Sequence, residues 1–218
     1  EAVLSYFADN GGNFIDTADM YSEWGSGNVG GESETIIGNW LKKRGDRDSV
    51  VIATKVAKLS TRRGLSAKNL QAACEDSLSR LQTDYIDLYY AHEDDPQTPL
   101  EETLGAFDSL IQSGKVRYIA ASNFKAERLQ ESLEVSRKNG FAAYVAAQDQ
   151  FNLLERDYER TLQPTLVEKS LSQLPYFGLA RGFLTGKYRP GKSVDSMRAG
   201  GMSSYQNERG WALLSKMD

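Results

Sequence analysis

The sequence has little of several features that mark specialised classes of protein. Its single cysteine, Cys74, cannot form an internal disulfide, which fits a reducing compartment. No apolar run approaches the ~18 residues of a membrane span, and the opening EAVLSYFADNGG has neither a basic segment nor a signal-peptide cleavage site. Acidic residues (30) outnumber lysine and arginine (26), whereas a nucleic-acid binder needs a basic face. We therefore expect a cytoplasmic protein that binds neither nucleic acid nor membrane.

Short apolar runs rich in β-branched and aromatic residues recur along the chain and predict strands. Their length and composition are typical of parallel strands that are buried on both faces. They cover residues 13–18, 50–56, 85–92, 116–122, 143–148 and 173–179. Amphipathic stretches between them predict helices at 32–45, 66–82, 99–115, 125–140 and 161–171. Ser66 is placed to cap the second of these helices, and Gly114 and Gly140 to end the third and fourth.

Strict alternation of strands and helices is compatible with an open doubly wound sheet or with a closed barrel. An open dinucleotide-binding sheet should show G-x-G-x-x-G directly after its first strand, and that motif is missing. The glycine-rich segment 25–34 is interpreted as a flexible loop that leads into a helix, with Glu32 and Glu34 favouring the helix N-terminus. The prediction is therefore a parallel (β/α)8 TIM barrel.

The chain is too short for the whole of that barrel. It has 218 residues and six predicted strands, whereas a complete eight-stranded barrel typically needs ~250 residues. We expect a single domain over residues 1–218 that is incomplete at both ends. A barrel that lacks two neighbouring strands has open edges, which predicts possible self-association through them.

Polar side chains gather where the predicted strands end. They are Asp16, Tyr21, Lys55, His92, Ser122, Asn123, Gln148 and Tyr176. Each by itself could be a turn former, a solvated lysine or a structural histidine. In a β/α barrel, however, the carboxyl ends of all strands meet on one face, which is the face that holds active sites. Their coincidence over six strands predicts a polar site, and no metal site is predicted.

The residue types in this site suit carbonyl reduction. A tyrosine ordinarily ionises near pH ~10, so it can protonate a developing alkoxide only when a nearby ammonium favours the phenolate. Tyr21 is the predicted acid, and Lys55 is the group that tunes it. Asp16 would keep the lysine charged and oriented, while His92 would position the carbonyl oxygen and stabilise its developing charge.

The other polar residues suit a flat heterocycle that carries a carboxamide. Side chains of Ser122, Asn123 and Gln148 can bond both the donor and the acceptor sides of an amide. Tyr176 offers an aromatic face on which a ring can stack. These four residues together would hold a nicotinamide.

At this point the sequence resembles the aldo-keto reductases, in the branch similar to bacterial aldo/keto reductases and to potassium channel β subunits. The residues that carry the resemblance are NFIDTADMY (13–21), GGESETIIGNWL (30–41), VIATKV (51–56), DLYYAH (87–92), GKVRYIAASNF (114–124), QDQFNLLER (148–156) and LPYFGLARGFLTGKY (174–188). They span nearly the whole chain, in the order and roughly the spacing of the family.

The resemblance implies roles for particular residues. The catalytic tetrad of the family corresponds to Asp16, Tyr21, Lys55 and His92. Its cofactor contacts correspond to Ser122, Asn123, Gln148 and Tyr176, and, around the pyrophosphate, to Leu179, Gly182, Leu184 and Lys187. Family precedent favours NADP(H) and leaves NAD(H) open. Trp24, just beyond Tyr21, is well placed to line a substrate mouth.

The sequence thus predicts an NAD(P)H-dependent oxidoreductase that reduces aldehydes or ketones to alcohols, with a tyrosine as the proton donor. Two alternatives stay open: a regulatory, non-catalytic subunit that binds the cofactor on the same fold, and an inactive fragment. The sequence does not indicate the physiological substrate, because the loops that select it vary while the fold stays the same.

Overall fold

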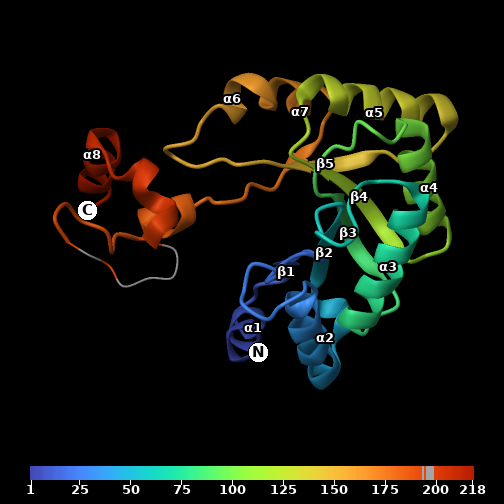
Figure 1. Ribbon diagram of the computed structural model, residues 1–218, viewed down its shortest axis with the longest axis horizontal. Helices are drawn as coiled ribbons and strands as arrows, with labels where there is room; N and C mark the ends of the chain where they lie inside the picture. Colours follow the sequence, from blue (N-terminus) through green and yellow to red (C-terminus); the bar gives the residue numbers. More distant parts are fainter. Residues whose placement is uncertain (193, 195–198) are drawn as a thin grey trace. The chain divides into compact units, whose positions relative to one another are not determined.

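The computed structural model describes residues 1–192, 194 and 199–218, and it divides into two compact units. The first unit is Glu1–Ala147 and the second is Gln148–Asp218 (Figure 1). The prediction of a single domain over the whole chain stays a prediction.

The first unit alternates helices and strands, as the sequence predicted. In chain order its elements are α1 (Ala2–Asp9), β1 (Phe14–Asp16), α2 (Glu32–Arg44), the 3₁₀ helix η1 (Arg47–Ser49), β2 (Val51–Val56), α3 (Ala67–Leu81), β3 (Ile86–Ala91), α4 (Leu100–Gln112), β4 (Val116–Ser122), α5 (Ala126–Asn139) and β5 (Tyr144–Gln148), whose last residue opens the second unit. All five strands lie within the predicted ranges.

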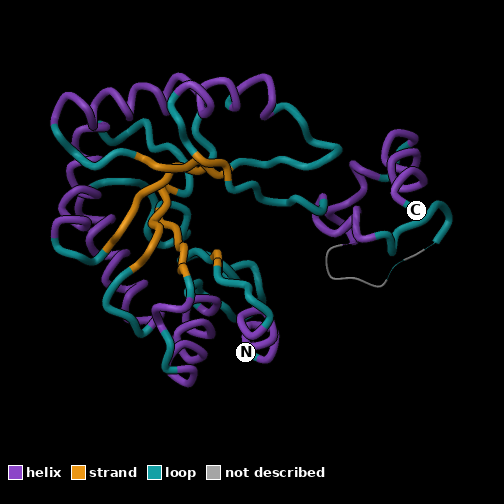
Figure 2. Tube along the Cα trace, turned by 180° about the vertical axis from the view of Figure 1, so that it is seen from behind, coloured by secondary structure: helices purple, strands orange, loops and turns teal. Residues whose placement is uncertain are grey.

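These strands form a curved sheet that is part of a β/α barrel. They follow one another in chain order from β1 to β5, and β1 with β2, β2 with β3 and β3 with β4 are paired in parallel. In Figure 2 the sheet of this unit bends like a barrel wall, with helices on its convex side. Helices α2 to α5 pack side by side in sequence order. This arrangement confirms the predicted fold class, a partial (β/α)8 barrel.

Local signals in the sequence explain where several helices begin and end. The Ser66 hydroxyl accepts a hydrogen bond from the backbone N–H of Asn69 at 3.4 Å, so it caps α3 as predicted. Gly140 ends α5 in the left-handed conformation, with φ of 67°. Such a conformation is costly for residues with a Cβ atom, which is why glycine stands there.

The core of the first unit lies between the sheet and its helices. Every residue of β3 is buried, as expected for a strand covered on both faces. Tyr118 of β4 is an exception, with 59% of its surface exposed. In register, Lys55 is opposite Tyr90 and Tyr90 is opposite Ala120, so Tyr118, two residues earlier, shares the face that carries Lys55. The prediction of burial on both faces is therefore wrong at this position.

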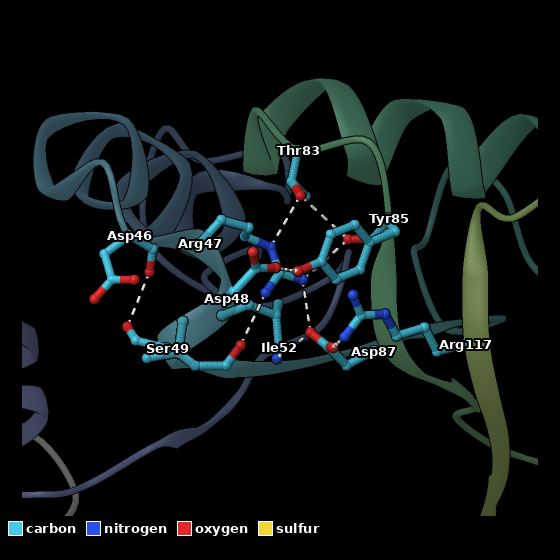
Figure 3. Close-up of polar contacts among 10 residues, drawn as sticks. Asp46, Arg47, Asp48, Ser49, Ile52, Thr83, Tyr85, Asp87 and Arg117 are labelled. Atoms are coloured by element: carbon cyan, nitrogen blue, oxygen red, sulfur yellow. Dashed lines mark hydrogen bonds and ion pairs between the residues drawn. The ribbon is translucent and has the colours of Figure 1, made fainter.

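A cluster of charged and aromatic residues closes the amino ends of β2, β3 and β4 (Figure 3). We call Arg47, Tyr85, Asp87 and Arg117 the basal arginine cluster. The Asp87 carboxylate accepts hydrogen bonds from Arg47 at 2.6 Å, from Arg117 at 3.0 Å and from the Ile52 N–H at 2.9 Å. The Tyr85 ring lies 4.1 Å from one guanidinium and 3.8 Å from the other. Because active sites of β/α barrels lie at the other end of the strands, we interpret this cluster as stabilising.

The second unit contains short elements. They are α6 (Tyr158–Thr161), α7 (Gln163–Glu168), β6 (Ser172–Gln173), the 3₁₀ helices η2 (Ala180–Thr185) and η3 (Ala199–Tyr205), and α8 (Glu208–Met217). The predicted strand at 173–179 is therefore wrong beyond Gln173. Pro175 has no N–H for a ladder and Phe177 is left-handed, with φ of 55°, so only Tyr176 forms a bridge, to Gln150.

Phe183 organises the core of the second unit. Its ring packs against those of Tyr188, Tyr205 and Trp211, with centroids 5.3–6.1 Å apart. Leu184 and Leu214 are buried in the same cluster. In the described ranges of the whole chain, no helix is both long and apolar enough to span a membrane.

Candidate active site

Lys55 is the centre of the polar site in the first unit. It lies on β2 with no exposed surface, and a buried ammonium is stable only when its hydrogen bonds are satisfied. Its Nζ donates to the Asp16 carboxylate in a short ion pair, to the Thr17 carbonyl at 2.7 Å and to the Tyr21 hydroxyl at 3.1 Å. The three N–H bonds of the ammonium therefore each have an acceptor. Residues separated by as many as 39 positions in the chain meet at this one atom.

Asp16 and Tyr21 reach the lysine because the chain after β1 is held against β2. The Thr17 N–H donates to the Ala53 carbonyl at 2.8 Å, and the Asp19 N–H donates to the Lys55 carbonyl at 3.2 Å. These bonds continue the parallel pairing of the two strands beyond the end of β1. Tyr21 follows Asp16 by five residues, and over this distance the chain turns back toward the lysine. The Tyr21 ring therefore lies beside Lys55, with Nζ 4.8 Å from the ring centroid.

His92 follows β3 and lies beside the tyrosine. Its backbone N–H donates a hydrogen bond to the Val56 carbonyl at 2.9 Å, which continues the pairing of β2 and β3. The rings of His92 and Tyr21 are arranged edge to face, with centroids 6.0 Å apart. Burial, followed by the positive charges of Lys55 and Lys58, lowers the pKa of His92 to about 3. The imidazole is therefore neutral at physiological pH, with one ring nitrogen as a donor and the other as an acceptor.

Ser122 and Asn123 end β4 next to the histidine. Asn123 is left-handed, with φ of 59°, a conformation that asparagine tolerates better than most residues. Its Nδ2 donates to the His92 carbonyl at 2.9 Å and to the Ser122 hydroxyl at 3.0 Å. The structure thus brings six of the predicted site residues together on consecutive strand ends: Asp16, Tyr21, Lys55, His92, Ser122 and Asn123.

Trp24 lies at the outer side of this group. Its ring centroid is 6.0 Å from that of Tyr21, at an interplanar angle of 61°. The side chain is 71% exposed, which is unusual for so large an apolar ring. The structure therefore places Trp24 next to the tyrosine and exposed, and its contact with a substrate stays a prediction.

The remaining predicted residues lie in the second unit. Gln148 is buried, and the Tyr176 N–H donates to the Asp149 carbonyl at 3.1 Å. Leu179 directly precedes the 3₁₀ helix η2, which contains Gly182 and Leu184, and Lys187 lies just after this helix. Gly182 has φ of 105°, and its backbone faces open space on the side where other residues carry a Cβ atom. The cofactor roles of these residues stay predictions.

A buried carboxylate pair lies near the site, and the sequence does not reveal it. The sequence predicts only that Glu34 favours the helix N-terminus, yet its side chain has no exposed surface and contacts Thr54 and Arg80. Asp19 is also buried, and burial, followed by the charge of Glu34, raises its pKa to about 7. The motif NFIDTADMY contains two acidic residues, Asp16 and Asp19, but no local pattern reveals which carboxylates are buried.

Comparisons with known proteins show which sequences this chain resembles. Relatives include "Uncharacterized oxidoreductase YrpG" of Bacillus subtilis (strain 168), 39% identical over 85% of this chain and 59% of that protein. "Protein tas" of Escherichia coli (strain K12) is 34% identical over 87% of this chain and 62% of its own length. "Norsolorinic acid reductase B" of Dothistroma septosporum is 33% identical over 89% and 51%.

The chain spans between about half and three-fifths of the length of these relatives. The sequence model described as "Aldo/keto reductase family" matches residues 1–212, which is nearly the entire chain. The site around Lys55 lies within that match. This chain belongs to the aldo/keto reductase family.

Proposed function

We propose that this protein reduces an aldehyde or ketone to an alcohol, with a hydride from NADPH and a proton from Tyr21. The observation that carries the proposal is the contact of 3.1 Å between the Lys55 ammonium and the Tyr21 hydroxyl. A fully buried ammonium against a phenol favours the phenolate that remains once the proton has left.

Each residue around this pair has a role in the proposed reaction. Tyr21 donates its hydroxyl proton to the carbonyl oxygen as the hydride reaches the carbonyl carbon, so a C–H bond and an O–H bond form while the C=O double bond becomes single. Lys55 stabilises the resulting phenolate. Asp16 holds the lysine in place and balances its charge. The neutral imidazole of His92 donates one N–H toward the carbonyl oxygen, which orients the substrate.

The polar side chains near His92 suit the carboxamide of a nicotinamide. Asn123 and Ser122 present an amide and a hydroxyl next to the proposed reaction centre, and the Asn123 side chain is oriented by its bond to the His92 carbonyl. A nicotinamide bound here would supply the hydride. We further propose that Gln148 and Tyr176 contact the amide and the ring, that Leu179, Gly182, Leu184 and Lys187 contact the pyrophosphate, and that Trp24 contacts the substrate.

The experiment that tests the proposal is reduction of 4-nitrobenzaldehyde, followed by loss of NADPH absorbance. The Tyr21→Phe variant should lose at least about a hundredfold in kcat, the contribution typical of a positioned general acid, while binding NADPH as before. Tyr118→Phe is a matched control, because that tyrosine is exposed at the other end of its strand. Equal turnover by wild type and Tyr21→Phe would refute the role of Tyr21.

Parallel titrations with NADPH and NADH show which nucleotide the protein prefers and, together with the turnover assay, distinguish a reductase from a regulatory binding subunit. Tighter binding of NADPH supports the proposed cofactor, whereas tighter binding of NADH overturns that choice. Nucleotide binding without turnover of any aldehyde would instead support a regulatory binding subunit.

A further inference from the structure

The first turn of α2 lies behind the strand that carries Lys55. Glu34 in this turn accepts a hydrogen bond from the Thr54 hydroxyl at 2.5 Å and from Arg80 Nε at 2.7 Å. Thr54 directly precedes Lys55, and successive side chains of a strand point to opposite faces. The Glu34 carboxylate therefore binds the outer face of β2 through Thr54, the residue next to Lys55.

A second hydrogen bond joins the same helical turn to Thr17, one of the residues that bind the Lys55 ammonium. The Thr17 hydroxyl donates to the Ser33 hydroxyl at 2.8 Å. The carbonyl of Thr17 is one of the three acceptors of the Lys55 ammonium. Through Ser33 and Glu34, the start of α2 thus contacts both the strand that carries Lys55 and the segment that holds its charged end.

Stability alone does not account for this buried carboxylate. Glu34 has no exposed surface, and taking an ion pair out of water costs roughly as much as the pairing returns, so an apolar residue of similar size would stabilise the fold at least as well. What a buried, hydrogen-bonded carboxylate adds is a defined geometry, because its two oxygens fix the positions of both donors.

We propose that Glu34 is a positioning residue, which sets the separation of the Lys55 ammonium and the Tyr21 hydroxyl from behind the sheet. Glu34 does not touch either group. It acts through Thr54 on one side, while its neighbour Ser33 acts through Thr17 on the other. The inference rests on the proposed function only in treating Lys55 and Tyr21 as the reacting pair.

The single histidine of the chain makes the geometry measurable without turnover. His92 contributes the only Cε1–H histidine resonance, and the ring current of Tyr21, 6.0 Å away, affects its chemical shift. At pH 7 the imidazole is neutral, so a change in this shift reports movement rather than protonation. The experiment compares the full chain with its Glu34→Gln and Thr54→Val variants, both of which nearly preserve side-chain volume.

Asp87→Asn is the matched control. Asp87 is also a buried carboxylate that pairs with arginines, but it lies five residues before His92, which directly follows the same strand, and so is about 16 Å away at ~3.3 Å per residue. We expect the His92 resonance to move by more than its line width in Glu34→Gln and Thr54→Val, and to stay in place in Asp87→Asn. The kcat for 4-nitrobenzaldehyde should fall at least about tenfold in both test variants, with KM changed less than about twofold.

The outcomes separate this inference from the proposed function. An unmoved His92 resonance in a folded Glu34→Gln or Thr54→Val variant overturns the positioning role. If Glu34→Gln does not fold, the Thr54→Val variant alone provides the test. An equal movement in Asp87→Asn also overturns it, because general loosening would then explain the effect. If the resonance moves as expected but wild type reduces no carbonyl, the positioning of the pair stands and the proposed function fails.

Discussion

The neutrality of His92 leads to a prediction about stability in acid. Burial and two nearby lysines lower its pKa from 6.5 to about 3 in the folded protein. As the pH falls below 6.5, the unfolded chain takes up a proton at this residue and the folded protein does not. The folded state therefore loses stability between pH 6.5 and 3, and the full loss is about 5 kcal/mol for a shift of this size.

A comparison of two pH values isolates this effect. At pH 5 the histidine should cost the folded state about 2 kcal/mol, and at pH 7.5 almost nothing. Other groups titrate in the same range, so the relevant quantity is the difference in the free energy of unfolding between wild type and His92→Asn, which has no ionisable group at this position. Urea denaturation followed by tryptophan fluorescence measures that difference at both pH values.

We expect the difference to change by about 2 kcal/mol, with wild type losing more stability at pH 5 than the variant. Carbon-13 NMR of the single histidine provides an independent check, because its Cε1–H shift should stay constant from pH 8 to 5. A resonance that titrates near pH 6.5, or a stability difference that is the same at both pH values, would refute the reasoning. In Lys55→Met the pKa of His92 should rise but stay below 6.5, because burial is the larger cause.

Three further predictions concern Asp19, Asp87 and Tyr176. The pKa of Asp19 is raised from 3.8 to about 7, so the folded state holds a proton that the unfolded chain has lost, and stability falls as pH rises through this range. Asp19→Asn should therefore gain about 3 kcal/mol relative to wild type between pH 4.5 and 7.5, measured by urea denaturation; a constant difference would contradict this. Asp87→Ala should destabilise the protein by about 3 kcal/mol, since it leaves Arg47 and Arg117 without their carboxylate, and an unchanged melting temperature would show the basal arginine cluster to be unimportant. Tyr176→Ala should weaken binding of both NADPH and NADH, measured by quenching of tryptophan fluorescence, and unchanged affinity would remove its proposed stacking role.

Local signals were sufficient for most of the first unit. The strands β1 to β5 were predicted because apolar runs of this length and composition are typical of buried parallel strands, whatever surrounds them. The same reasoning failed after Gln173, where Pro175 and the left-handed Phe177 interrupt an equally apolar run. The predicted helix at 161–171 is confirmed over Gln163–Glu168, which form α7, whereas Thr161 is the last residue of the separate helix α6.

The sequence by itself determined which residues end the strands, and hence that Asp16, Lys55, His92 and Asn123 gather at one end of the sheet. Only the tertiary structure decided the charge and orientation of these groups. The neutral state of His92, the three acceptors of Lys55 and the burial of Glu34 all depend on contacts between residues far apart in the chain. The physical reason is the range of the interactions, because backbone preferences and periodicity act between near neighbours, whereas burial and electrostatic pairing depend on whatever the fold places nearby.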